Sequence, residues 1–465
     1  MQVLDQAVAR PQFGALAPDS APPLERLAAR VPRYTSYPTA NRFSDAVGPK
    51  DYEQWLAALA DDAALSLYVH IPFCTQMCWY CACSTKATHR YAPVTRYLKS
   101  LAQEIDAVAA RAPKRHRLTH LQWGGGSPDI LTADDMLRLG ERLRGAFHLD
   151  ADTEFGMEVD PRLMTREKAD SLAAIGVNRI SVGVQDFDPA VQKAIGRIQS
   201  YDDSRSSIDL FRERGVGSIN VDLVYGLPLQ TEESLGRTLE QVLTLCPDRV
   251  AVFGYAHLPA RAHNQRLIDE SVLPGAAQRL TFSAQIVRRL EAAGYRQLGL
   301  DHFARPHDSL AIRPLNRNFQ GYTTDDADAL IGLGASAIGR FAQGYVQNVV
   351  ASGDYARRID ADGLATARGW RVSLDDAARA WVIERLMCDF TFSPRELLRR
   401  FGNGVMDIVL EAQALLRSDL ADILVATDDG FRIQERARPF VRAVCARFDT
   451  YLRGGTAGAT HSLAV

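Results

Sequence analysis

The sequence predicts an α/β protein made of a partial TIM-type barrel of six strand–helix units, an N-terminal extension and a helical C-terminal domain. Three observations support this fold class. Short apolar runs alternate with longer amphipathic segments over residues 61–365, polar residues follow the ends of those runs, and strand-like runs fade after about residue 365. Strands that alternate with helices form parallel sheets, so the alternation predicts repeated βαβ units. Polar residues at the carboxyl ends of strands are typical of barrel enzymes.

The first 60 residues form the expected N-terminal extension. Residues 1–30 are rich in alanine and proline with weak periodicity, which indicates a loose or partly helical leader. Residues 31–40, VPRYTSYPTA, combine prolines with turn-forming residues, so we expect an extended segment there.

Six apolar runs supply the expected strands of the barrel. Each is short, rich in β-branched or aromatic residues, and closed by a turn signal or a polar residue. They cover residues 66–72, 120–126, 154–160, 179–185, 218–226 and 249–255. The segments between them have helical periodicity, most clearly at residues 94–112, 133–147 and 231–245. We therefore expect one catalytic domain over residues 61–365.

The remainder of the chain, residues 366–465, is expected to form a mostly helical domain. Helical periodicity is evident at residues 373–390, 405–421 and 431–453.

Composition and charge narrow the range of partners. The net charge of −2 gives no argument for a nucleic-acid or membrane-surface partner. No apolar run approaches the roughly 18 residues that a membrane-spanning helix needs. The N-terminus has an early acid, Asp5, and no apolar core, which is unlike a signal peptide. A cytoplasmic protein is the expectation.

Four of the seven cysteines lie within ten residues, directly after the first expected strand: Cys74, Cys78, Cys81 and Cys83. The spacing C-x-x-x-C-x-x-C lets three thiolates of one loop bind three irons of a [4Fe–4S] cluster. The fourth iron then has no protein ligand, and an open metal position can bind a small chelating molecule. The amino and carboxylate groups of S-adenosylmethionine suit that position, so the loop predicts a radical enzyme.

Zinc is the competing interpretation of this loop. A structural zinc site normally uses two separated ligand pairs, which four cysteines in ten residues fit poorly. A role without any metal would leave thiols open to oxidation. The other cysteines, Cys246, Cys388 and Cys445, have apolar neighbours and are expected to be buried small hydrophobic residues.

Candidate ligand-binding residues stand at the other strand ends. Gly124, Gly125 and Gly126 remove side chains where a ligand could approach the backbone, although a simple turn is the alternative. Acids and amides follow the next strands, and they are either ligand contacts or solvated groups: Glu158, Asp160, Gln185 and Asp222.

An anionic substrate would need some arginines, among which Arg33, Arg162, Arg197 and Arg317 are candidates. His70 precedes Cys74 by four residues, whereas His302 and His307 are expected to be packing or loop residues.

The segment YVHIPFCTQMCWYCAC, residues 68–83, resembles the signature of the oxygen-independent coproporphyrinogen III oxidases. These are radical S-adenosylmethionine enzymes of haem biosynthesis. The resemblance extends in order along nearly the whole chain. The matching segments include VPRYTSYPTA (31–40), WGGGSP (123–128), EVDPR (158–162), SVGVQDF (181–187), NVDLVYGLPLQT (220–231), DHFARP (301–306), RNFQGYTT (317–324), GLGASAI (332–338) and FDTYLR (448–453).

This resemblance implies a function and a set of partners. Members convert coproporphyrinogen III to protoporphyrinogen IX by oxidative decarboxylation of two propionates to vinyl groups. They are monomers with a partial barrel of the radical S-adenosylmethionine type and a helical C-terminal domain, and residues 31–40 are expected on the substrate side. They bind two S-adenosylmethionine molecules near the cluster and require an electron donor such as flavodoxin or ferredoxin.

The resemblance also assigns roles to residues of this chain. Cys74, Cys78 and Cys81 match the cluster ligands, while Cys83 and His70 match catalytic residues beside the cluster. The match to the cluster-bound S-adenosylmethionine contacts covers Tyr68, Tyr80, Gly125, Glu158 and Ile338. The match to the contacts of the second molecule covers Gly126, Ser127, Gln185, Arg197, Asp222 and Ala256.

Two departures and three alternatives stay open from the sequence. The family's GGGTPT motif is GGGSPD here, which introduces Asp129, and residues 307–316 form a shorter segment than usual, which puts a substrate contact there in doubt. The alternatives are a haem chaperone of the same superfamily, a radical S-adenosylmethionine enzyme acting on another tetrapyrrole, and a zinc-stabilised interaction module. The chaperones typically lack the fourth cysteine and segments like residues 31–40.

Overall fold

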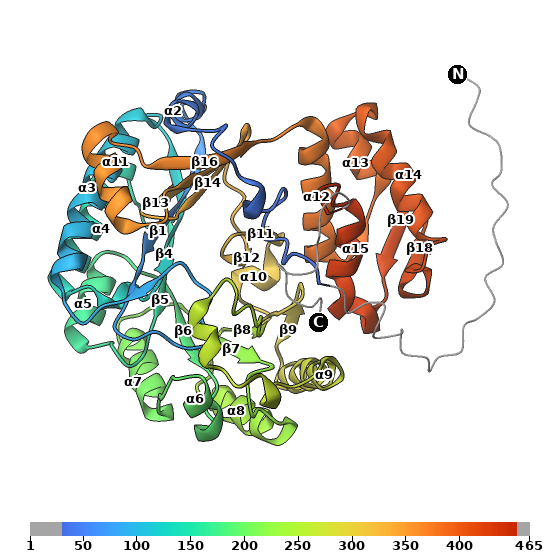
Figure 1. Cartoon of the computed structure of the whole chain (residues 1–465), viewed down its shortest axis with the longest axis horizontal. Coiled ribbons are helices and arrows are strands. Elements are labelled where there is room, and N and C mark those ends of the chain that lie inside the picture. Colours follow the sequence, from blue (N-terminus) through green and yellow to red (C-terminus); the bar gives the residue numbers. More distant parts are fainter. Residues whose placement is uncertain (1–29, 453–465) are drawn as a thin grey trace.

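The computed structural model describes residues 30–452, and its core is a curved sheet whose central strands are parallel (Figure 1). Six neighbouring strands pair in parallel in the order β1, β4, β5, β6, β7 and β8. Their bounds are β1 (Ala64–Ile71), β4 (Arg117–Gly125), β5 (Glu154–Val159), β6 (Arg179–Gln185), β7 (Ser218–Tyr225) and β8 (Arg249–Gly254). Each coincides with one of the six apolar runs, so the predicted partial barrel is confirmed.

Helices cover the outer face of these strands (Figure 1). They are α3 (Ala92–Arg111), α4 (Ala133–Phe147), α5 (Arg166–Ala174), α6 (Pro189–Ala194), α7 (Tyr201–Arg212), α8 (Glu232–Thr244) and α9 (Ala276–Ala292). In α4, the Thr132 side chain caps the first turn, and the residues at helical spacing, Met136, Leu139, Leu143 and Phe147, are buried. Such stripes and the outward side chains of the strands form one continuous apolar core.

The inward faces of the strands are polar, which is unusual for parallel strands. Along β6, Ile180, Val182 and Val184 are buried, and the alternate residues Arg179 and Ser181 are only half-buried. Since side chains alternate across a strand, this pattern separates an apolar outer face from a polar interior. The polar interior is where a site can form.

The sheet extends beyond the six predicted strands on both sides, to twelve strands in all. Beside β1 it adds β13 (Ala329–Leu333) in parallel, then β14 (Ile338–Phe341), β15 (Gly344–Asn348) and β16 (Thr366–Arg371) antiparallel. Beside β8 it adds the short strands β10 (His302–Ala304) and β9 (Arg296–Leu298). The domain division at residue 365 stays a prediction, and we note that the large sheet continues to Arg371.

Smaller elements complete the barrel region. The extension contributes α2 (Pro49–Ala57), whose Tyr52, Trp55 and Leu56 are buried in the main core. The other elements are β2 (Phe73–Cys74), β3 (Lys86–Ala87), the hairpin of β11 (Asn316–Asn318) and β12 (Gly321–Thr323), α10 (Ser309–Ile312) and α11 (Ser352–Asp362).

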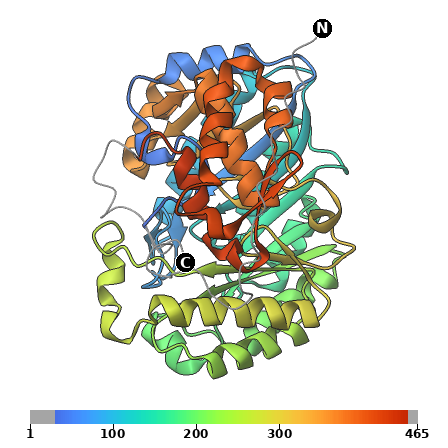
Figure 2. The same cartoon turned by 90° about the vertical axis from the view of Figure 1, so that its right-hand side faces the viewer.

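The C-terminal region packs as a unit with its own apolar core beside the barrel (Figure 1 and Figure 2). Its helices are α12 (Leu374–Asp389), α13 (Pro394–Phe401), α14 (Met406–Leu415) and α15 (Val441–Phe448). A small antiparallel sheet of β17 (Thr391–Phe392), β19 (Gly430–Ile433) and β18 (Leu424–Thr427) accompanies them. The sequence did not predict these strands.

The segment at residues 31–38 connects the two regions. Tyr34 Oη donates a hydrogen bond to Asp449 at 3.1 Å, and Tyr37 Oη lies 3.1 Å from Thr450 Oγ1. On the barrel side, Tyr345 Oη donates to the backbone oxygen of Tyr37. The segment therefore holds the C-terminal region against the barrel.

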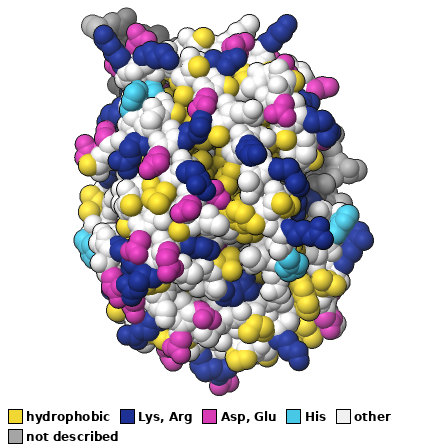
Figure 3. Space-filling view, turned by 90° about the vertical axis from the view of Figure 1, so that its left-hand side faces the viewer, with side chains coloured by type: hydrophobic (Ala, Val, Ile, Leu, Met, Phe, Trp, Pro, Cys, Tyr) yellow, Lys and Arg dark blue, Asp and Glu magenta, His cyan; other side chains and the backbone are white. Residues whose placement is uncertain are grey.

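Two features bear on partners. Within residues 30–452, none of the helices has the length and apolar character needed to cross a bilayer. Acidic and basic side chains are interspersed on the face shown in Figure 3.

Candidate active site

The cysteine loop lies between β1 and α3 at the carboxyl end of the barrel. The short strands β2 and β3 pair at its two ends. Asn264 Nδ2 donates to the backbone oxygens of Cys78, Trp79 and Cys81 at 2.8–3.1 Å, and Gln265 Nε2 donates to that of Tyr80. These two amides, in η3 (His263–Leu267), fix the loop from across the barrel. Sequence reasoning missed them, because no periodicity marks a side chain that binds a distant backbone.

The four thiols of the loop line one cavity and form no disulfide. Cys78 is buried, Cys74 and Cys81 are half-buried, and Cys83 is exposed. Arg197 Nη1 donates to Cys78 Sγ at 3.6 Å, which places a cationic donor beside one of the expected cluster ligands. The side chain of Cys83 lowers the pKa of Cys81 to about 7 by hydrogen bonding, whereas burial raises the pKa of Cys74 to about 12.

These thiols fit an iron–sulfur cluster. Across the described residues 30–452, no three side chains of His, Cys, Asp or Glu stand close enough together to bind a single metal ion. A cluster offers a separate iron to each thiolate, so its ligands need not meet at one point. Cys74, Cys78 and Cys81 could hold such a group.

The glycines after β4 allow close packing behind the loop. A Cβ atom on Gly124 would lie 2.7 Å from Glu158 Oε1, and one on Gly125, whose φ is +117°, would lie 2.6 Å from the His70 ring. Side chains at these positions would displace both groups. A simple turn therefore does not explain these glycines, because their Cα atoms face other residues of the site.

His70 and Tyr68 lie on β1 behind the cavity wall. His70 Nε2 is 2.9 Å from the backbone oxygen of Ser84, and Tyr68 Oη is 3.0 Å from His70 Nδ1. A carbonyl accepts only, so Nε2 carries the proton and Nδ1 accepts from the tyrosine. Burial lowers the pKa of His70, which keeps the ring neutral.

Two carboxylates of the site belong to β5 and β7, the strands on either side of β6. Glu158 accepts a hydrogen bond from the Gly125 amide at 3.1 Å, and burial, with Asp222 nearby, raises its pKa to about 7. Asp222 accepts from Ser181 Oγ at 2.5 Å and Asn220 Nδ2 at 2.7 Å, while burial raises its pKa. Both could accept hydrogen bonds from an amino or hydroxyl group of a ligand.

Arg197 and Arg162 share one carboxylate. Asp160 accepts two bonds from Arg162 at 2.9 and 2.6 Å, and Arg197 Nη1 lies 3.3 Å from it. Arg197 Nη2 donates to the backbone oxygen of Gly183 at 2.7 Å. The Asp160 amide donates to Asp129 at 2.6 Å, so the unusual residue of the GGGSPD motif supports this network.

Most residues that the sequence singled out line a single cavity of about 710 Å³. Besides the four cysteines, the lining includes Tyr80, Gly125, Gly126, Ser127, Glu158, Gln185, Arg197, Asp222 and Ala256. Tyr68, His70 and Ile338 do not line it. Tyr68 pairs with Gly332 of β13, and Ile338 lies beside Gly332 on the next strand, β14.

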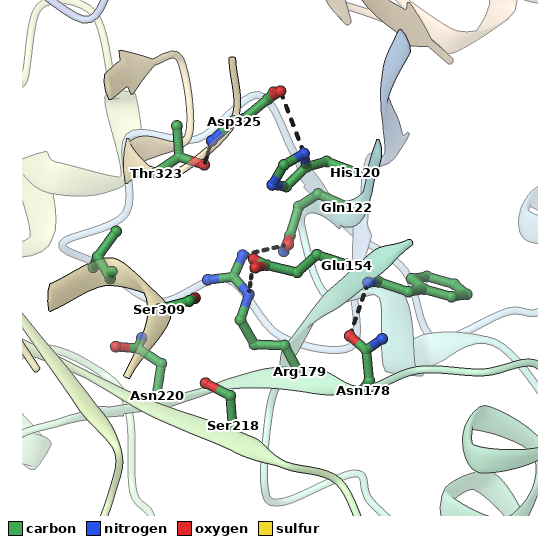
Figure 4. A network of polar contacts seen from close by, with 12 residues as sticks. His120, Gln122, Glu154, Asn178, Arg179, Ser218, Asn220, Ser309, Thr323 and Asp325 are labelled. Atoms are coloured by element: carbon green, nitrogen blue, oxygen red, sulfur yellow. Dashed lines mark hydrogen bonds and ion pairs between the residues drawn. The ribbon is translucent and has the colours of Figure 1, made fainter. Parts of the chain in front are cut away.

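The shortened segment at residues 307–316 does not line this cavity. Asp308 instead forms a buried ion pair with Arg249, 2.7 Å apart, at the amino end of β8. Figure 4 shows Ser309 facing the polar network of Arg179, Glu154 and Gln122 that fills the barrel at that end. Residues 307–316 therefore cannot contact a substrate bound in the cavity that the cysteine loop lines.

Other sequence expectations had mixed outcomes. Cys388 and Cys445 are buried as expected, but Cys246, which lies in the loop between α8 and β8, is exposed. His302 is buried and its Nδ1 lies 2.8 Å from Asp301, whereas His307 is largely exposed.

Comparison with known proteins identifies the family. The Radical SAM superfamily model matches residues 68–242. The oxygen-independent coproporphyrinogen III oxidase of Bradyrhizobium diazoefficiens is 43% identical over 92% of this chain and 96% of that protein. The enzyme of that name from Escherichia coli is 40% identical over 91% and 93%. A solved structure of coproporphyrinogen III oxidase from Escherichia coli, described as a radical SAM enzyme, has a TM-score of 0.86 and 38% identity, covering 90% of this chain and 97% of that one.

The chain belongs to the oxygen-independent coproporphyrinogen III oxidase family. Membership confirms the predicted fold class and the prediction of a radical S-adenosylmethionine oxidoreductase. A [4Fe–4S] cluster and S-adenosylmethionine are the cofactors of such enzymes. The zinc-stabilised module has no support from these matches.

Proposed function

We propose that this protein oxidatively decarboxylates two propionates of coproporphyrinogen III to vinyl groups, giving protoporphyrinogen IX, in a cytoplasmic pathway of haem biosynthesis. The observation that carries the proposal is the convergence of Cys74, Cys78 and Cys81 with Glu158 and Arg197 on one large cavity. Family membership supports the choice of substrate.

The site residues are assigned to three ligands in this proposal. Cys74, Cys78 and Cys81 hold the cluster, which when bound supplies the electron that cleaves S-adenosylmethionine to methionine and a 5′-deoxyadenosyl radical. Tyr68, Tyr80, Gly125, Glu158 and Ile338 serve the cluster-bound S-adenosylmethionine. Gly126, Ser127, Gln185, Arg197, Asp222 and Ala256 serve a second molecule.

The protein's own groups position and shield the reactants. Arg197 donates a hydrogen bond to Cys78 Sγ, and Asp160 and the Gly183 carbonyl orient its guanidinium. His70 and Cys83 are the proposed catalytic residues beside the cluster. Neutral His70 orients Tyr68, and the Cys83 thiol hydrogen-bonds to Cys81 at the cavity wall.

Each vinyl group requires one balanced sequence of steps. A hydrogen atom passes from the propionate β-carbon to the 5′ carbon, which gives 5′-deoxyadenosine. The bond to the carboxylate then breaks, carbon dioxide leaves, a carbon–carbon double bond forms, and one electron passes to a one-electron acceptor. A one-electron donor such as flavodoxin or ferredoxin supplies the electron for the next cleavage. We propose that the protein does this as a monomer.

An anaerobic assay of the reconstituted full chain tests the proposal. With coproporphyrinogen III, a reductant and S-adenosylmethionine, we expect protoporphyrin after oxidation and 5′-deoxyadenosine in step with the vinyl groups. Absence of vinyl products from a preparation with a full complement of iron and sulfide would refute it. Stoichiometric haem binding without vinyl formation would favour the haem chaperone, and turnover of only another porphyrinogen would favour a different tetrapyrrole substrate.

A further inference from the structure

The cavity wall away from the cysteine loop carries a second concentration of charge. Four arginines line it, which we call the arginine cluster: Arg33, Arg279, Arg317 and Arg442. They come from four separate parts of the chain, namely the segment at residues 31–38, α9, β11 and α15. The cluster thus forms only where the N-terminal segment, the barrel and the C-terminal helices meet.

The members of the cluster lie close enough to affect one another. Desolvation lowers the pKa of Arg33, Asp301 and Tyr225 oppose that shift, and neighbouring Arg279 and Arg317 add to it. Burial, followed by Arg33, lowers the pKa of Arg442 to about 10. Like charges gathered in a partly enclosed cavity repel, so the arrangement needs a compensating anion.

The protein itself supplies little of that compensation. Among the described residues, neither Arg33, Arg279 nor Arg317 forms an ion pair with a carboxylate, and the Nε of Arg279 and one Nη of Arg317 are buried without a hydrogen-bond partner. The nearby Asp301 influences Arg33 and Arg317, yet its short contact is with His302 at 2.8 Å. Buried donors without partners are costly, and a ligand carboxylate would satisfy them.

The backbone and aromatic contacts hold the guanidinium groups in place. Arg33 Nη2 donates to the Gly254 oxygen at 2.6 Å, and Arg317 Nε donates to the Tyr34 oxygen at 3.2 Å. The guanidinium of Arg279 lies 5.6 Å from the centre of the Tyr225 ring. Held in this way, planar guanidinium groups are ready to bind carboxylates in pairs of hydrogen bonds.

We propose that the arginine cluster binds the propionates of the porphyrinogen that the reaction leaves intact. The inference rests on the proposed function for the identity of the substrate. It assigns residues that fix the orientation of the substrate, with the reacting propionate directed toward the cysteine loop.

Two physical arguments favour the intact propionates over the reacting ones. A carboxylate held by several guanidinium groups is stabilised as an anion, and loss of carbon dioxide would forfeit those bonds. Bonds to the intact propionates persist in substrate, transition state and product, so they supply uniform binding that positions the reacting centre. In addition, Glu158 and Asp222 near the cysteines would repel a carboxylate, while Arg162 and Arg197 are already paired with Asp160.

Equilibrium binding of two air-stable porphyrins to the full chain tests this assignment. Coproporphyrin III has all of the propionates, whereas protoporphyrin IX has only those that survive the reaction. We expect Arg279→Gln to weaken binding of both by the same factor, about tenfold to a hundredfold for a charge-assisted hydrogen bond. Arg279→Lys should restore part of the affinity. Arg288→Gln, on the exposed face of the same helix, should leave both affinities unchanged.

Turnover of the reconstituted enzyme gives a second test. For Arg279→Gln, the KM for coproporphyrinogen III should rise by a similar factor with little change in kcat, as expected for uniform binding. Weaker binding of coproporphyrin alone, with a fall in kcat, would assign the cluster to the reacting propionates and overturn the proposal. Unchanged binding of both porphyrins would show that the cluster is no carboxylate site. If wild-type protein forms no vinyl groups, the proposed function fails, while the binding result for the cluster still stands on its own.

Discussion

The two ends of the cavity satisfy their charges in opposite ways. At the cysteine end, the acids have partners: Asp160 is bound by two arginines, and Asp222 accepts bonds from Ser181 and Asn220. At the arginine end, guanidinium groups gather around one aspartate that pairs with a histidine. The first end is therefore organised before any ligand binds, and the second leaves charge for a ligand to complete.

This difference matches the charges of the two proposed ligands. S-adenosylmethionine carries a sulfonium and an ammonium group, which acids such as Glu158 and Asp222 suit. A porphyrinogen carries several carboxylates, which arginines suit. One cavity with opposite charges at its two ends can thus hold both ligands and still keep them in a fixed relative orientation.

The largest effect is expected when the cysteine end can no longer hold a cluster. Cys78→Ser removes a cluster ligand that is buried beside Arg197, so the reconstituted variant should lack the charge-transfer absorption of a thiolate–iron cluster and form no vinyl groups. Absorption spectra with iron and sulfide analysis check this. Cys246→Ser changes an exposed thiol far along the chain and should retain both properties. A full cluster in Cys78→Ser would contradict the ligand assignment.

A smaller effect is expected when only the cosubstrate contact is removed. Arg197→Ala loses bonds to Asp160, Cys78 and the Gly183 carbonyl. A charged hydrogen bond from this guanidinium to bound S-adenosylmethionine is worth about 1.5–3 kcal/mol, so its loss should raise the KM for S-adenosylmethionine about tenfold to a hundredfold. Iron content should change little, because the cysteines remain.

The measurement that decides this prediction is a titration of the reconstituted variant with S-adenosylmethionine, followed by the cluster spectrum. Porphyrin binding at the arginine end should stay as in wild-type protein. Equal losses at both ends would mean that the cavity has collapsed and that the two ends are not independent.

The pH dependence should differ between the two ends. Burial raises the pKa of Glu158 to about 7, so this carboxyl is protonated below that pH and charged above it. Since a cation favours the charged form, the KM for S-adenosylmethionine should fall by about fivefold as the pH rises from about 6 to about 7. Arginines do not titrate in this range, so porphyrin affinity should stay nearly level.

Glu158→Gln provides the control for this comparison. The amide cannot ionise, so the slope of KM against pH should disappear in the variant, and its KM should resemble that of wild-type protein at low pH. A slope that persists in Glu158→Gln would assign the titration to another group.

The sequence predicted the cysteine end much better than the arginine end. Strand periodicity and the rule that chemistry gathers at carboxyl ends are local signals, and they found Glu158, Gln185 and Asp222. Arg33 and Arg317 were named only as candidates among several arginines, and Arg279 and Arg442 were missed. Helical periodicity shows which face of α9 or α15 is apolar, but not which arginine meets another when the C-terminal helices pack against the barrel.

The strands beyond the six predicted ones were missed for a related reason. β13 to β16 are only four to six residues long, so their periodicity is brief. Their pairing depends on β13 reaching the free edge of β1, which is a contact between residues more than 250 positions apart, as Leu65 and Ala329 show. Such long-range pairing leaves no local pattern.

The smallest expected effect concerns Asp129, the residue that departs from the family motif. Its carboxyl is fully buried and binds Ser127 Oγ and the Asp160 amide, so it supports two groups at the cysteine end without lining the cavity. Asp129→Ala should lower the free energy of unfolding by about 1–3 kcal/mol, the usual result of leaving buried donors unpaired. It should raise the KM for S-adenosylmethionine less than Arg197→Ala does.

The pH dependence of unfolding separates the charge of Asp129 from its hydrogen bonds. Burial, with Asp160 nearby, raises the pKa of Asp129 to about 7, so the folded protein keeps a proton that the unfolded chain releases near pH 4. The contribution of this group to the free energy of unfolding therefore falls as the pH rises from about 4 to about 7. Asp129→Asn retains an acceptor but cannot titrate. Denaturant unfolding should therefore show that the free energy of unfolding of the variant rises relative to that of wild-type protein as the pH rises across that range. A constant difference between the two proteins would mean that Asp129 is ionised throughout and balanced by Lys168, which binds its backbone oxygen.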